Sequence, residues 1–239
     1  MMIKIVNKGF SFTTTELLVL LALKKAKGIY GLFDDNAELS QKDINEIVFH
    51  LFKNGILDRN GDEFIISDEV SDILDDIIGA KRLIVFSASD ESMYEQCAYV
   101  GKRSVYLRFD GSDSKRVHIY PADLNELAES VVDSGWGIES ILPSTDSVIA
   151  DDMDSITEDL DIQTLSKQEI LSKASVHSLI EVVELKNNTV TSKVIVFCKG
   201  VDDYIICNNG NESKVYRYTE ELIRKIIISE AEGKEYDFC

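Results

Sequence analysis

The sequence lacks clustered positive charge. Its 239 residues carry 25 lysines and arginines against 43 aspartates and glutamates, which gives a formal net charge of -18. The excess is spread along the chain, because 1–80, 81–150, 151–173 and 174–239 are each net negative. Affinity for a phosphate backbone or an anionic membrane comes mainly from clustered lysine and arginine. The composition therefore argues against nucleic acid and membrane surfaces as partners.

Long hydrophobic runs and a cysteine framework are also missing. The longest apolar run, Leu17 to Leu23, is far too short to cross a bilayer, and the first residues lack the apolar stretch of a signal peptide. The cysteines Cys97, Cys198, Cys207 and Cys239 form no CxxC pair. Isolated cysteines in a chain of this length are typical of apolar packing in a reducing compartment. We therefore expect a soluble cytoplasmic protein.

The motifs of nucleotide binding, covalent catalysis and metal binding are absent as well. The sequence contains no GxGxxG, GxxxxGK[ST] or GxSxG. His50, His118 and His177 have no Cys or His at ligand spacing, and the run DDMD at 151–154 lacks the glycine and terminal glutamate of a calcium loop. We expect a chain with no catalytic residue, no cofactor and no metal, and hence not an enzyme.

The N-terminal third is rich in helix signals. Thr13 with Glu16 forms a capping box before an apolar run, and Ser40 with Asp43 begins a second helix. That second helix has an apolar stripe at helical spacing, made of Ile44, Ile47, Val48, Leu51 and Phe52.

A hairpin and a third helix follow. Asn60-Gly61 between two apolar pieces predicts a tight turn, and Ser67 caps a helix that ends at Gly79. Helix, helix and small hairpin together predict a winged-helix-like module over 1–82. Its candidate recognition helix exposes side chains with no net charge, which disfavours DNA binding: Lys42, Asp43, Asn45, Glu46, His50 and Lys53.

From residue 83 the apolar period changes to two. A first unit over 83–143 is predicted to have strands at 83–88, 94–100, 104–109 and 115–119, and then a helix over 122–133. A second unit over 178–239 is predicted to have strands at 179–185, 190–198, 203–207 and 214–218, and then a helix over 219–231. The fold class is therefore α+β, with two antiparallel sheet-plus-helix units.

The two units contain similar sequences. The segment at 101–124 in the first unit reads GKRSVYLRFDGSDSKRVHIYPADL. It matches the segment at 200–222 in the second unit, which reads GVDDYIICNNGNESKVYRYTEEL. At an offset of 99 the shared residues include Gly101/Gly200 and Gly111/Gly210, and after a one-residue gap they include Tyr120/Tyr218. The match predicts an internal repeat and a body with quasi-two-fold symmetry, whose function lies in a surface.

Between the units lies an acidic linker over 144–177 with a short helix from Ser166. Its structural interpretation is a solvated connection. Its functional interpretation is a segment that presents apolar side chains to a partner, namely Ile149, Met153, Ile156 and Leu160. The single tryptophan, Trp136, either packs on the adjoining sheet or serves as an exposed aromatic anchor.

In this order of elements the chain resembles the EspG-type cytosolic chaperones of type VII secretion. The resemblance lies in the runs TTTELLVLLALKKA and SQKDINEIVFHLFKNGIL, the hairpin DRNGDEFIISDEV, and the strand pair and helix of GKRSVYLRFDGSDSKRVHIYPADLNELAESV. It spans 10–235 and implies a quasi-two-fold core. Members of that family bind secretion substrates in the cytoplasm and keep them soluble. The resemblance transfers no role to an individual residue.

These observations predict a non-enzymatic cytosolic binding protein, a chaperone or adaptor for a small helical secretion substrate. Two alternatives stay open at this point. A winged-helix transcriptional regulator would need a basic surface, and an enzyme would need a pocket of convergent ionisable groups. The oligomeric state is left open.

Overall fold

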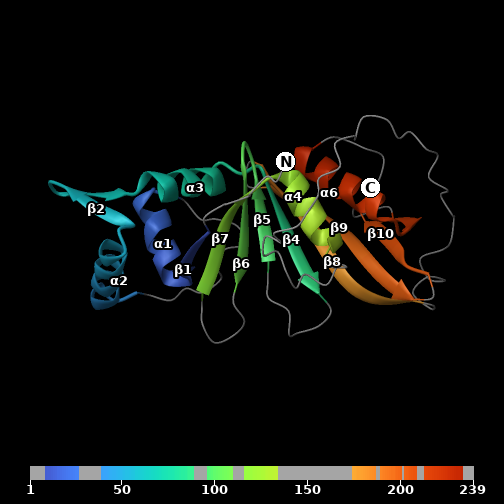
Figure 1. Ribbon diagram of the computed structural model, residues 1–239, viewed down its shortest axis with the longest axis horizontal. Helices are drawn as coiled ribbons and strands as arrows, with labels where there is room; N and C mark the ends of the chain where they lie inside the picture. Colours follow the sequence, from blue (N-terminus) through green and yellow to red (C-terminus); the bar gives the residue numbers. More distant parts are fainter. Residues whose placement is uncertain are drawn as a thin grey trace, which may run out of the picture.

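The computed structural model describes residues 9–26, 39–88, 96–109, 116–133, 174–186, 189–200, 202–208 and 213–233. Within these residues, nine strands form one antiparallel sheet, two further strands form a separate hairpin, and the helices pack on both faces of the sheet (Figure 1). The fold is thus mixed, with a large antiparallel sheet and a few helices, as the change of apolar period predicts in outline.

The N-terminal part begins with a short strand and two capped helices. Strand β1 (Phe10–Thr13) leads into α1 (Thr14–Leu23), and α2 (Gln41–Lys53) follows. The predicted capping box at Thr13 is present, since Glu16 N–H donates to Thr13 Oγ1 at 3.1 Å, and the predicted cap Ser40 also forms a capping box, in which Asp43 N–H donates to Ser40 Oγ at 3.2 Å. These local hydrogen bonds satisfy amide donors that a helix leaves unpaired at its start.

The hairpin and α3 lie next in the chain. Strand β2 (Leu57–Asn60) pairs with β3 (Glu63–Ile66) around a turn in which Gly61 has φ +62, a left-handed value that glycine adopts without strain. Helix α3 (Asp68–Ile78) then leads to the large sheet.

The large sheet contains two runs of four strands, and each run is followed by a helix. The first run is β4 (Arg82–Ala88), β5 (Gln96–Val100), β6 (Ser104–Phe109) and β7 (Arg116–Ala122), followed by α4 (Leu124–Asp133). The second run is β8 (Ala174–Lys186), β9 (Thr189–Gly200), β10 (Tyr204–Asn208) and β11 (Ser213–Arg217), followed by α6 (Glu220–Glu232).

The two runs share one continuous sheet. Its strand order is β1-β7-β6-β5-β4-β8-β9-β10-β11, so each run reads outwards from the central pair β4 and β8. The two central strands are antiparallel, with Leu83 opposite Val183. The similar segments 101–124 and 200–222 cover the third and fourth strands of each run and the start of the helix after them.

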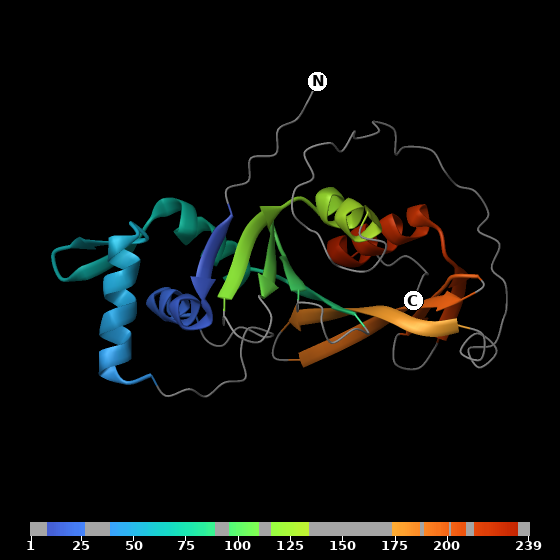
Figure 2. The same cartoon turned by 60° about the horizontal axis from the view of Figure 1, so that its bottom comes forward.

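Helices α4 and α6 lie side by side over one face of this sheet (Figure 2). Their apolar residues form one core with strand residues from both runs, including Phe86, Tyr106, Ile180 and Phe197. On the opposite face, α1 and α3 pack on the first run, where Leu83, Tyr99 and Leu107 are fully buried. Within the described residues, the helices thus cover both faces of β4–β7.

Two strand details differ from the sequence-based expectation. Strand β1 was not predicted, and it is held by pairing with β7, in which Phe10 lies opposite Ile119. Strand β8 begins at Ala174 rather than at 179, because its first residues pair with the end of β9.

Candidate protein-binding surface

The face of β8–β11 that points away from α6 carries an apolar surface. Side chains alternate between the faces of a strand, and Ile195 and Phe197 of β9 pack under α6, so Val196 and Cys198 point to the other side. On that side, strand pairing aligns two rows of side chains across β8–β11, and we call these two rows together the C-terminal sheet face. The first row is Val176, Cys198, Tyr204 and Arg217. The second row is Leu179, Val196, Ile206 and Val215.

The residues that pack on the C-terminal sheet face differ in kind from those that pack on the strands of the first run. The C-terminal sheet face forms its own small cluster, in which Cys198 and Ile206 are buried and Val196, Tyr204 and Val215 are half-buried. Every described residue of that cluster comes from a strand. Val176 is 43% exposed. In the described part of the chain, therefore, no helix residue belongs to this cluster, and Val176 is the exposed apolar side chain beside it.

A fixed ion pair borders the C-terminal sheet face. Arg217 Nη2 donates to Asp202 Oδ1 at 2.7 Å, and Tyr204 Oη donates to the same carboxylate at 3.4 Å. The hydrogen bond and charge of Arg217 lower the pKa of Asp202, and those of Asp202 raise the pKa of Arg217. Because each charge has its partner, this rim adds little net charge to the surface beside it.

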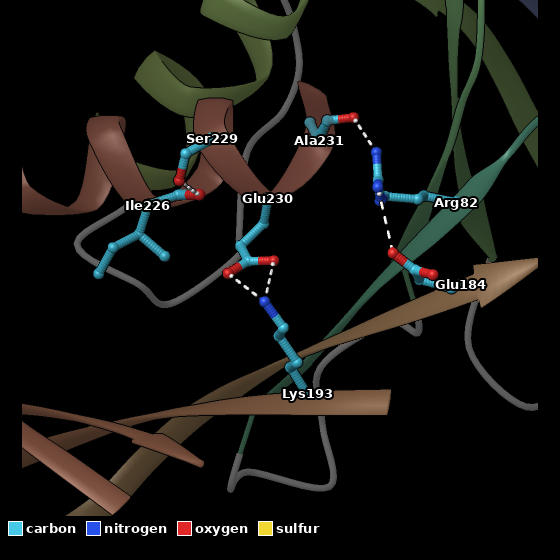
Figure 3. Close-up of polar contacts among 7 residues, drawn as sticks. All are labelled: Arg82, Glu184, Lys193, Ile226, Ser229, Glu230 and Ala231. Carbon is cyan, nitrogen blue, oxygen red and sulfur yellow. Dashed lines mark hydrogen bonds and ion pairs between the residues drawn. The ribbon is translucent and has the colours of Figure 1, made fainter. Parts of the chain in front are cut away.

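Partly buried polar contacts hold α6 against the other side of the same strands (Figure 3). Lys193 Nζ of β9 lies 3.2 Å from both carboxylate oxygens of Glu230, which is only 7% exposed. Arg82 donates to the carbonyl oxygen of Ala231 at 3.2 Å and to Glu184 Oε1 at 3.1 Å. The strands that carry the C-terminal sheet face are therefore backed by a firmly attached helix.

A second pair joins α6 to α4. Arg224 donates to both carboxylate oxygens of Glu129, at 2.7 and 2.9 Å, in the bidentate arrangement that guanidinium and carboxylate groups favour. The hydrogen bonds and the charge of Glu129 raise the pKa of Arg224. The two helices thus form one layer over the sheet.

The structure does not test the residues that the sequence predicts to bind a partner. Trp136, Ile149, Met153, Ile156 and Leu160 all lie outside the described residues. The C-terminal sheet face was not singled out by the sequence, because alternation shows that a strand has two faces but not which face is left without a helix.

Other kinds of site find no support in the part of the chain that the structure describes. There, no group of three or more His, Cys, Asp or Glu side chains is placed to hold a metal ion. Cys97, Cys198 and Cys207 are buried. Cys198 and Cys207 lie on neighbouring strands but on opposite faces of the sheet, which prevents a disulfide between them. Among the described helices, none has both the length and the apolar character to span a membrane.

The arrangement is an antiparallel sheet that α4 and α6 cover on one face, with a small strand-only apolar cluster on the other face of β8–β11. The structure is similar to that of the type VII secretion system chaperone EspG5 of Mycobacterium tuberculosis, which was solved in complex with the PE25–PPE41 dimer. The TM-score is 0.59 and the identity 8%, and the match covers 93% of this chain and 96% of EspG5. No protein-family model and no curated protein sequence matches the chain. The predicted EspG-type resemblance is confirmed at the level of the fold.

Proposed function

We propose that this chain is a non-enzymatic binding protein, a chaperone or adaptor for a small helical secretion substrate. The observation that carries the proposal is the fold shared with EspG5 over almost the whole of both chains. The C-terminal sheet face supports it, because an apolar surface on a helix-backed sheet can bury the apolar stripe of a helix.

The mechanism is burial without turnover. A partner helix placed across β8–β11 would cover Val176, Val196 and Tyr204 and remove its own apolar stripe from water, which prevents premature association of the partner. The net charge of -18 would speed association with basic partners and make the association rate fall as salt is added. No cofactor enters this scheme.

The same proposal includes a division of the chain. It takes 1–82 as a winged-helix-like module, 83–143 and 178–239 as two repeated units related by a quasi-two-fold axis, and 144–177 as the linker, whose last residues from Ala174 already belong to β8. The order of strands on either side of the β4–β8 pair supports the repeat, and α2 followed by the β2–β3 hairpin supports the module.

We further propose that five residues contribute to partner binding, namely Trp136, Ile149, Met153, Ile156 and Leu160. We also propose that the protein acts in the cytoplasm, where its buried thiols stay reduced.

The test is a tagged pull-down from native cells with two matched variants. Val176→Asp places a charge on the C-terminal sheet face, whereas Ile78→Asp places the same charge at a side chain of similar exposure, 40%, on α3. We expect the wild type and Ile78→Asp to retain one helical protein in near-stoichiometric amount, and Val176→Asp to lose it.

Two results would contradict the proposal. Recovery of no partner by the wild type would remove the chaperone role, and equal loss by both variants would remove the C-terminal sheet face as the site. Co-purifying DNA would instead favour a regulator, although the structure shows Asp43, Glu46, Asp58 and Glu63 exposed on the α2–hairpin module.

A further inference from the structure

An aromatic patch lies on α2 and the β2–β3 hairpin. Phe49 of α2 is 70% exposed and Phe64 of β3 is 45% exposed. Between them, Phe52 is half-buried, and its ring meets that of Phe64 edge-on with 5.6 Å between centroids. Because side chains three positions apart are neighbours on a helix surface, Phe49, Phe52 and Phe64 form one surface. We call these three residues the aromatic patch.

Phe49 contributes little to the packing of its own module. The inward stripe of α2 is formed by other residues, of which Leu51 is buried and Ile47 and Val48 pack on the N-terminal core. A phenylalanine with most of its side chain in water is costly for solubility and is typical of a contact surface. Figures 1 and 2 both place α2 and the hairpin at one end of the molecule, far from β10.

The surroundings of the aromatic patch are acidic. From 41 to 66, five exposed carboxylates face three cations: Asp43, Glu46, Asp58, Asp62 and Glu63 against Lys42, Lys53 and Arg59. Two of the cations are already paired within the module, Lys42 with Glu46 at 3.7 Å and Arg59 with Asp62 at 3.5 Å. The hydrogen bonds of Ser40 lower the pKa of Asp43, which keeps that carboxylate charged.

This combination selects one kind of partner. An acidic rim repels nucleic acid and anionic membranes, and it repels a second copy of the chain, which would bring the same rim to the contact. We propose that the aromatic patch docks an amphipathic helix of a partner protein, whose apolar side is flanked by lysine and arginine. Phe49 and Phe52 lie along one ridge of an exposed helix, which is the surface that a second helix packs on.

The proposal stands on different residues from those of the chaperone function. The aromatic patch and the C-terminal sheet face lie toward opposite ends of the molecule (Figure 1). A chain with both surfaces can hold two proteins at once, so that a bound substrate is brought to a second, basic component. Loss of either surface leaves the other intact, and the two proposals can fail separately.

The test measures binding of a fluorescent peptide to the full chain. The probe is an amphipathic helix of about five turns made of leucine and lysine, and anisotropy gives its affinity. We expect Phe49→Ser and Phe64→Ser to weaken binding roughly tenfold or more, as for anchoring aromatic residues. Ile78→Ser, at an exposed apolar residue outside the patch, is the matched control and should keep wild-type affinity. The series is repeated in the Val176→Asp background, so that the C-terminal sheet face does not contribute.

Three results would overturn the proposal. The first is that Phe49→Ser binds the probe with wild-type affinity. The second is that a peptide of leucine and glutamate binds as tightly as the probe. The third is that a leucine and lysine peptide whose residue order is not amphipathic binds as tightly as the probe. The last would show attraction by charge alone. Phe64→Ser removes a contact with Phe52, so thermal unfolding is compared first, whereas Phe49 is so exposed that its variant should keep the wild-type melting temperature.

Discussion

Gly233→Ala is a sharp test of how α6 is fixed to the sheet. Gly233 ends α6 with φ +69, and a side chain in that left-handed conformation costs about 1–2 kcal/mol. A Cβ at this position would also collide with the guanidinium of Arg82, which lies directly against the glycine. The substitution therefore has two separable costs, one of the backbone and one of the contact.

The contact cost follows from the hydrogen bonds that Arg82 would give up. The guanidinium is the far end of a flexible side chain and can move aside, but it then loses its bonds to Ala231 O and Glu184 Oε1. The Arg82 side chain is only 14% exposed, so water replaces these bonds poorly. Hydrogen bonds of charged groups contribute about 1.5–3 kcal/mol in such settings. We expect Gly233→Ala to lower the free energy of unfolding by about 3 kcal/mol in total.

Urea unfolding followed by circular dichroism measures this loss, and Gly61→Ala separates its parts. Gly61 has nearly the same φ, +62, but a Cβ there meets no atom within 4 Å, so only the backbone cost of about 1–2 kcal/mol remains. In an Arg82→Met background the extra loss at Gly233 should disappear. Equal losses for Gly233→Ala and Gly61→Ala in the otherwise wild-type chain would refute the role given to Arg82.

Three further stability predictions use the same urea assay. Lys193→Met should cost about 2 kcal/mol, because it leaves the buried Glu230 carboxylate without its cation, whereas Lys42→Met, in an exposed pair, should change stability little. Thr13→Ala should cost about 1 kcal/mol through loss of the α1 cap. Tyr106→Phe should cost about 1–2 kcal/mol, because the buried Gln96 loses the hydroxyl that donates to it. Burial raises the pKa of Tyr99 and Tyr106, so both keep a proton that the unfolded chain releases above about pH 10. The free energy of unfolding should therefore fall as the pH rises above that value, and fall less steeply in Tyr106→Phe.

Local signals in the sequence predicted the parts of the fold that depend on neighbouring residues. The capping box at Thr13, the helix cap at Ser40 and the turn at Asn60-Gly61 involve residues at most three positions apart, and the structure confirms all three. The strands of both runs were predicted by alternation, because each has an inward face that must be apolar. The same alternation did not predict which of the two sheet faces a helix covers.

Features set by distant contacts could not be predicted in this way. Strand β1 is only four residues long and depends on β7, and Arg82 meets the end of α6 across 149 positions of the chain. Phe49 was absent from the exposed residues expected on α2, because a phenylalanine next to an apolar stripe is ordinarily assigned to the core. Its exposure is set by where the hairpin and α1 lie, which is a property of the tertiary structure.

The acidity of the chain and the exposed apolar residues of the C-terminal sheet face are related. Exposed apolar side chains such as Val176 favour association between copies, whereas a net charge of -18 on each copy opposes it. Salt removes the second effect, since the screening length falls from about 10 Å at 0.1 M to about 3 Å at 1 M. We therefore expect the wild type to self-associate as salt is raised, measured by sedimentation. Val176→Asp should stay monomeric, whereas Ile78→Asp, which adds the same charge elsewhere, should associate like the wild type. If all three chains associate alike, the apolar contact lies on another surface and the C-terminal sheet face loses this support.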